Sequence, residues 1–151
     1  MRNFSNILVA VDFSDSSDNA FQLALSMAQK FSAHLVILHV INEPVDLRGF
    51  YVPHISYEKL EEEIAEGAEK MMQSFCRMHI DDFTDYETRI VPGMPFEKIL
   101  EQADKADAEL IVLGTHGRTG LDHVLFGSTA EKVVRKSKLP VLTVRLEEDL
   151  K

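Results

Sequence analysis

The sequence lacks the features that mark secreted or membrane-embedded proteins. It holds one cysteine in 151 residues, Cys76, so no internal disulfide can form and we interpret this residue as a small buried hydrophobe. No apolar run approaches the roughly 20 residues that a membrane-spanning helix needs. The first six residues lead directly into a short apolar run and do not resemble a signal peptide. We therefore expect a cytoplasmic protein without a membrane span.

Positive charge is also scarce. The net charge of −9 argues against nucleic-acid binding, which needs a basic surface. Residues 114–138 are the exception, because five basic residues there oppose two acidic ones, a net of +3 that leaves −12 for the rest. Such a segment suits a polyphosphate ligand. Alternatively, its basic residues after position 130 form a solvated helix face and C-terminus.

Common catalytic and metal-binding motifs are missing as well. The six histidines form no H-x-x-x-H pair, there is no C-x-x-C, and no G-x-S-x-G is present. The chain also lacks the P-loop pattern and G-x-G-x-x-G. We therefore predict no catalytic residues and no metal ligands from protein side chains.

A glycine-rich stretch at residues 114–129 is the most informative segment. It contains Gly114, Gly117, Gly120 and Gly127, follows the apolar run 110–113 and leads into a helical pattern. Glycines let backbone amides approach a ligand, and the start of a helix binds anions. We interpret the stretch as a phosphate-binding loop. The alternative is a glycine-rich loop that binds nothing.

The rest of the chain alternates between predicted strands and helices. Apolar runs predict strands at 7–11, 35–41, 86–91, 109–113 and 139–145, the third being an edge strand because its pattern alternates. Apolar spacing predicts helices near 17–31, 57–79, 96–103 and 127–137. The longest of them should bury one apolar stripe, made of Leu60, Ile64, Ala68, Met71, Met72, Phe75 and Met78. A long connection, 42–56, precedes it and suggests a flap over the site or a disordered segment. This alternation predicts one α/β domain, residues 1–151, with helices on both faces of a parallel sheet.

The glycine spacing resembles a known signature. Gly114-x-x-Gly117, nine further residues and then Gly127-Ser128 are similar to the ATP-binding signature of the universal stress protein family. The segments 6–14, 34–40 and 138–144 resemble that family's first, second and last strands, so the likeness covers essentially the whole chain. It implies a Rossmann-like, five-stranded sheet in the order 3-2-1-4-5, as in adenine nucleotide alpha hydrolase-like folds. Strands 1 and 4 would then flank the point where the strand order reverses, and ligands bind there.

Asp12 and the glycine stretch would meet at that point. A carboxylate after a buried strand can accept hydrogen bonds from ribose hydroxyls, and the resemblance implies this role for Asp12, although the residue could instead cap the next helix. Backbone amides at the glycines, the hydroxyls of Ser128 and Thr129, and the guanidinium of Arg118 would contact phosphates. The full predicted nucleotide-binding set is Ala10, Val11, Asp12, Val40, Leu113, Gly114, Thr115, His116, Gly117, Arg118, Gly127, Ser128 and Thr129.

These expectations predict a regulatory binding module. The resemblance implies an ATP-binding universal stress protein that changes conformation or partner affinity with its nucleotide (ATP, ADP or AMP), with Mg²⁺ held through the phosphates. Hydrolysis should be slow at most. One alternative is a true ATPase or nucleotidyl-transfer enzyme using His116 or Arg118, and another is a nucleotide-independent protein acting through oligomer contacts. The last strand would be an exposed edge, so we also predict a homodimer through it.

Overall fold

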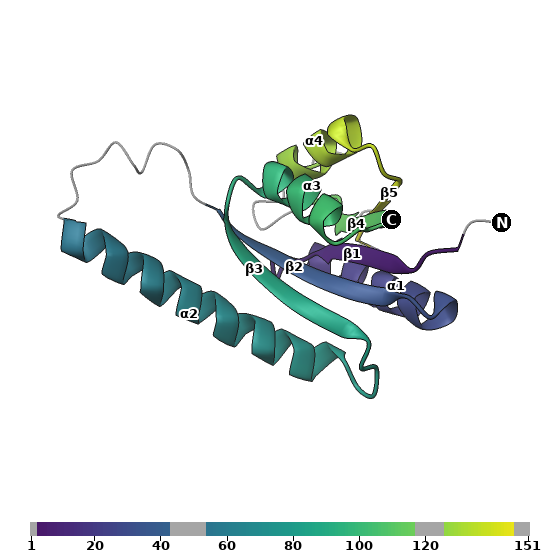
Figure 1. Cartoon of the computed structure of the whole chain (residues 1–151), viewed down its shortest axis with the longest axis horizontal. Helices are drawn as coiled ribbons and strands as arrows, with labels where there is room; N and C mark the ends of the chain where they lie inside the picture. The colour runs from purple at the N-terminus through teal and green to yellow at the C-terminus, as the bar shows by residue number, and fades with distance from the viewer. Residues whose placement is uncertain (1–2, 43–53, 117–125, 147–151) are drawn as a thin grey trace.

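The computed structural model describes residues 3–42, 54–116 and 126–146, with residues 54–57 described for the backbone only. Strands and helices alternate along these ranges as the sequence predicts (Figure 1). The elements are β1 (Asn6–Ala10), α1 (Asp15–Phe31), β2 (His34–Asn42), α2 (His54–His79), β3 (Tyr86–Gly93), α3 (Pro95–Lys105), β4 (Leu110–Gly114), α4 (Ser128–Lys136) and β5 (Val141–Val144). Within them, no helix is both long and apolar enough to cross a bilayer.

The five strands form one parallel sheet in the order β3-β2-β1-β4-β5, which confirms the predicted order. β1 lies in the middle, pairing with β2 on one side and with β4 on the other. β3 and β5 form the two edges. The strand order therefore reverses between β1 and β4, so the loops that follow these two strands leave in opposite directions.

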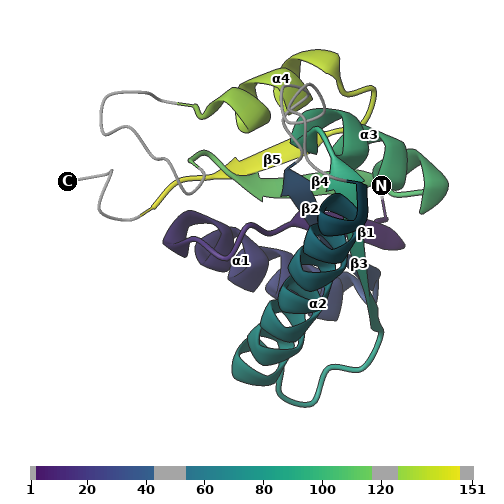
Figure 2. The same cartoon turned by 90° about the vertical axis from the view of Figure 1, so that its left-hand side faces the viewer.

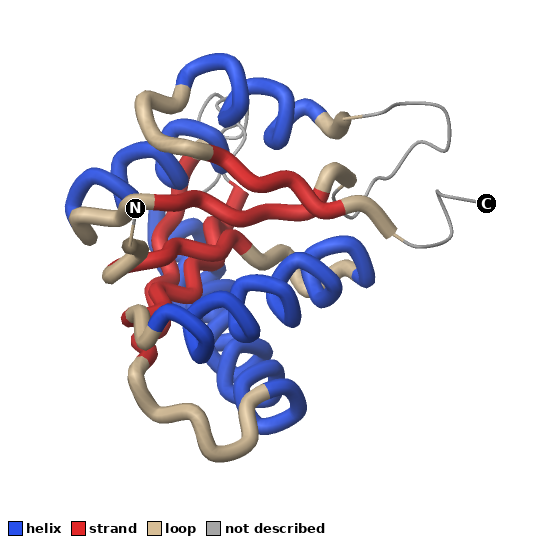
Figure 3. Tube along the Cα trace, turned by 90° about the vertical axis from the view of Figure 1, so that its right-hand side faces the viewer, coloured by secondary structure: helices blue, strands red, loops and turns tan. Residues whose placement is uncertain are grey.

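Each face of the sheet has its own apolar core. One core joins β1, β2 and β4 to α1 and α2, with Phe21, Met72 and Phe75 among its buried members. The other joins the opposite faces of the same strands to α3 and α4 through Ile99, Ala103 and Val133. Figure 3 shows the helices on either side of the strand layer. The continuous apolar runs of β1, β2 and β4 follow from this arrangement, because their side chains are buried on both faces.

Helix α2 differs from its predicted packing. It begins at His54, three residues before the predicted start, and only Ala68, Met72 and Phe75 of the predicted stripe are buried. The other four members are exposed: Leu60 by 51%, Ile64 by 46%, Met71 by 42% and Met78 by 77%. A helix of 26 residues is about 39 Å long, whereas the 8-residue strand β3 beside it spans about 26 Å. About the first third of α2 therefore extends beyond the sheet (Figures 1 and 2).

Candidate functional site

The candidate site lies where β1 and β4 end. After β1, the chain turns through Asp12 and Phe13 into α1, and after β4 it passes through Gly114 and Thr115 into the glycine stretch. The amide of Gly127 donates a hydrogen bond to the carbonyl oxygen of Thr115. This bond brings the beginning and the end of the glycine stretch together, so α4 starts directly beside the end of β4.

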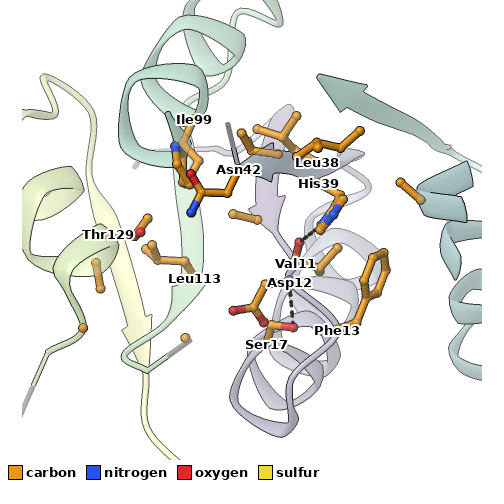
Figure 4. A pocket seen from close by; sticks show the side chains of 18 of the residues that line it. Val11, Asp12, Phe13, Ser17, Leu38, His39, Asn42, Ile99, Leu113 and Thr129 are labelled. Carbon is orange, nitrogen blue, oxygen red and sulfur yellow. Dashed lines mark hydrogen bonds between the residues drawn. The ribbon is translucent and has the colours of Figure 1, made fainter. Parts of the chain in front are cut away.

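A cavity of about 600 Å³ occupies this position (Figure 4). Its lining includes eleven of the thirteen residues predicted from the sequence: Ala10, Val11, Asp12, Val40, Leu113, Gly114, Thr115, His116, Gly127, Ser128 and Thr129. Gly117 and Arg118 lie outside the described residues. Asp12 and Ser128, which come from opposite parts of the sequence, thus share one cavity.

Asp12 is fixed by the first turn of α1. Its Oδ1 accepts hydrogen bonds from the amide of Ser14 at 3.0 Å and from the Ser14 hydroxyl. The amide of Asp12 donates to the hydroxyl of Ser17 at 3.2 Å. The helix cap itself is Ser14, whose hydroxyl accepts from the amide of Ser17. Asp12 is therefore not the cap of α1, and its carboxylate lines the cavity.

Helices α1 and α4, which both start at this cavity, have different caps. Helix α3 also starts there, at Pro95, which has no amide hydrogen to donate. Ser14 satisfies part of the first turn of α1, whereas the cap of α4, Gly127, has no side chain to do so. The first amides of α4 therefore lack a capping side chain beside the cavity, together with the partial positive charge of the helix start. Ser128 and Thr129 stand at the same place. Such a helix end can bind an anion.

His39 and Phe13 form a second part of the cavity wall. The Nδ1 atom of His39 lies 2.8 Å from the carbonyl oxygen of Val11, and because a carbonyl only accepts, Nδ1 carries the proton. The ring of Phe13 packs on that of His39 with centroids 4.5 Å apart. Phe13 has a φ of 65°, a left-handed conformation that is unusual for an aromatic residue. This backbone conformation directs the side chain of Phe13 toward His39.

The cavity extends over both faces of β2. Successive strand residues point to opposite faces, and Figure 4 shows Asn42 and His39 directed away from each other. Asn42 lies on the side of Ile99 and Thr129, whereas His39 lies on the side of α2, which contributes Ile64, Gly67, Ala68 and Met71. A ligand can therefore contact both helical layers from the end of the sheet.

Several lining residues were not predicted from the sequence. Leu38 and Asn42 flank Val40 at a spacing of two, so alternation along β2 could have indicated them. Pro95 and Ile99 of α3, and the four residues of α2, carry no such signal because their places depend on how the helices dock. Within the described ranges, no three histidine, cysteine, aspartate or glutamate side chains converge as metal ligands.

The fold and the cavity define a class: an open parallel α/β protein with a ligand-sized pocket at its switch point, bordered by a carboxylate and an uncapped helix start. The universal stress protein family model matches residues 3–145. The chain belongs to the universal stress protein family.

Individual relatives agree with this assignment. Universal stress protein YxiE of Bacillus subtilis is 34% identical over 147 residues, covering 94% of this chain and 99% of that protein. The structure of protein MJ0577 of Methanocaldococcus jannaschii superposes with a TM-score of 0.85 at 27% identity, over 97% of this chain and 99% of that one. A universal stress protein crystallised in complex with cAMP is 30% identical, with a TM-score of 0.60, over 95% and 98% of the two chains.

Proposed function

We propose that this chain binds an adenine nucleotide, principally ATP, in the cavity between β1 and β4. The observation that carries the proposal is that Asp12 and the uncapped start of α4 border the same cavity. A carboxylate suits the hydroxyls of a ribose, and a helix start suits phosphate. The cAMP complex of a relative 30% identical to this chain supports an adenine nucleotide as the ligand.

The lining residues divide between the parts of such a ligand. Ala10, Val11 and Val40 would contact the base, and Asp12 the ribose. Phosphates would meet the amides near Gly114 and Gly127 and the hydroxyls of Ser128 and Thr129, with Thr115 and His116 beside them. Gly117 and Arg118 would complete the phosphate contacts, and Mg²⁺ would accompany the phosphates.

We expect this chain to act as a nucleotide-dependent regulatory module in a stress response. Phosphoryl transfer depends on positive charge placed around the phosphates. The described lining of the cavity contains no lysine or arginine. Hydrolysis should therefore be slow at most. Steady ATP turnover that the Arg118→Ala substitution abolishes, with binding retained, would instead favour an enzyme.

Calorimetry with ATP and Mg²⁺ tests the binding proposal, using wild type and the Gly127→Val variant. Gly127 has an ordinary extended backbone, φ −67° and ψ 165°, which a valine can adopt, and the substitution adds a side chain at the start of α4. We expect the variant to lose at least about tenfold in affinity, the equivalent of one good hydrogen bond to a charged group. Ser26→Val, on the exposed surface of α1, is the control. Equal affinity in Gly127→Val and wild type would contradict the phosphate site.

We also propose that two copies associate through β5. Among the described residues this strand pairs with β4 alone, so its outer edge has no strand partner in that part of the chain. Natural proteins cover such edges, and two identical strands meeting about a two-fold axis would close this one.

A further inference from the structure

The carboxylate of Asp12 is held through one of its two oxygens. The hydrogen bonds from the amide of Ser14, at 3.0 Å, and from the Ser14 hydroxyl both end on Oδ1. Among the described residues, none donates a hydrogen bond to Oδ2. A rotation of the carboxylate would break both bonds to Ser14 at once. One residue thus sets the orientation of the group.

Ser14 is itself held rigidly. Its hydroxyl accepts a bond from the amide of Ser17 at 3.3 Å, and its carbonyl oxygen accepts one from the Ser17 hydroxyl at 3.2 Å. The Ser17 hydroxyl also accepts from the amide of Asp12 at 3.2 Å, which closes a ring of bonds from Asp12 through Ser14 to Ser17. Ser17 is only 4% exposed, so this ring is anchored in the packed interior. The orientation of Asp12 is therefore preorganised before any ligand arrives.

We infer that Ser14 is a positioning residue for the ligand's sugar: it fixes Asp12 so that Oδ2 accepts hydrogen bonds from a vicinal diol. Figure 4 shows the Asp12 side chain extending from the end of β1 toward the side of the pocket formed by Leu113 and Thr129. A carboxylate oxygen that accepts no hydrogen bond from the described residues can accept from both the 2′- and 3′-hydroxyls of a ribose. This inference rests on the proposed nucleotide binding and adds selection of the ribose over its deoxy forms.

The test compares ATP with 2′,3′-dideoxy-ATP by calorimetry in wild type and variants. Wild type should prefer ATP by roughly 10- to 100-fold, the range expected for hydrogen bonds to a charged group. In Ser14→Ala the preference should fall to about threefold or less, because the hydroxyl bond to Oδ1 is lost and only the backbone amide of residue 14 then restrains the carboxylate. Ser14→Thr, which keeps the hydroxyl, should restore it. In an Asp12→Ala background the preference should be absent, and adding Ser14→Ala should change it no further.

The ratio of the affinities for ATP and 2′,3′-dideoxy-ATP separates the effect of Ser14 on the orientation of Asp12 from its effect on the stability of the protein. Ser14 also caps α1, so Ser14→Ala will lower the melting temperature. Ser26→Gly weakens the same helix at an exposed position away from the cavity, and it should lower the melting temperature while keeping the ligand preference. An unchanged preference in Ser14→Ala would overturn the role of Ser14 and leave nucleotide binding intact. Equal binding of both ligands by wild type would also overturn the role of Ser14 while leaving nucleotide binding intact. If wild type bound neither ligand, the proposed function would be overturned as well.

Discussion

Gly114 lies directly against Ser16. A Cβ atom added to the glycine would stand 2.8 Å from the carbonyl oxygen of Ser16, and nearer still to its hydroxyl. Ser16 is 2% exposed and belongs to the first turn of α1, so it has no room to withdraw. The first glycine of the stretch is thus required by the contact between α1 and β4, in addition to any role in binding.

This contact predicts the effect of Gly114→Ala. Overpacking of this kind costs about 1–3 kcal/mol, and we expect the free energy of unfolding to fall by that amount in urea titrations. Because Ser16 belongs to the same turn as Ser14, nucleotide affinity should fall too. A variant as stable as wild type would show that the contact can relax.

The opposite result is expected for Gly67→Ala. Gly67 lies within α2, and a Cβ atom there would meet nothing within 4 Å. Alanine is favoured over glycine in a helix by about 1 kcal/mol, so the variant should be more stable by up to that amount. The same urea titrations provide the measurement, and the pair serves as a matched control for Gly114→Ala. Destabilisation by Gly67→Ala would contradict the open space beside this residue.

Two truncations in α2 test which part of its apolar stripe is packed. Phe75 is 6% exposed and contacts the rings of Phe13, Phe21 and His79, whereas Met78 is 77% exposed. Phe75→Ala should cost about 3–5 kcal/mol. Met78→Ala should stay within about 0.5 kcal/mol of wild type. Similar losses from both, measured by thermal unfolding, would mean that the whole stripe is buried.

The pH dependence of stability should involve His34. Its Nδ1 lies 2.8 Å from Asp85 and its Nε2 lies 3.1 Å from Glu87, and the hydrogen bond to Asp85 is the main cause that raises the pKa of His34 above its usual 6.5. Arg89, followed by His34, lowers the pKa of Glu87, which stays ionised in this range. A raised pKa in the folded state stabilises the protein fully below the unfolded value, and this contribution is lost as the pH rises through the folded value.

Wild type should therefore exceed His34→Gln in stability by more at about pH 6 than at about pH 8.5. Asp85 and Glu87, the partners of His34, are largely exposed, so the change in the stability gap between the two pH values will be small. Urea midpoints at the two pH values measure it. An equal gap between the two proteins at both values would exclude His34 as the titrating group.

The exposed edge of β5 predicts a dimer in solution. Sedimentation velocity at micromolar concentrations should show twice the mass of the chain. A proline substitution in β5, at a residue whose N–H faces the outer edge, should shift the monomer–dimer equilibrium toward monomer. Proline has no N–H to donate across the dimer contact. A monomeric wild type would contradict association through this strand.

Much of the fold was predictable because its strands are buried on both faces. The runs 7–11 and 35–41 predicted β1 and β2 to within one residue at each end. Short continuous apolar segments of this kind are typical of parallel strands that are buried on both faces. The strand order came from the family resemblance and is confirmed. The position of Asp12 beside the glycine stretch followed from that order.

The packing of α2 and the reason for Gly114 were not predictable. Periodicity identifies the apolar face of a helix but not where the neighbouring sheet ends, so Leu60 was wrongly assigned to the core. Met78, in the last turn of α2, was wrongly assigned as well. From the sequence alone, Gly114 is explained by the approach of its backbone to a ligand. In the structure it packs against Ser16, which is 98 positions earlier in the chain. Contacts between distant segments leave no local pattern in the sequence.

The exposed apolar side chains of α2 have one further consequence. Ile64 and Met71 leave more than two-fifths of their surface in water, yet both border the cavity. Any molecule that fills the cavity on that side removes water from these side chains. A ligand bound there would therefore stabilise the packing of α2 against the rest of the chain by the free energy of its binding.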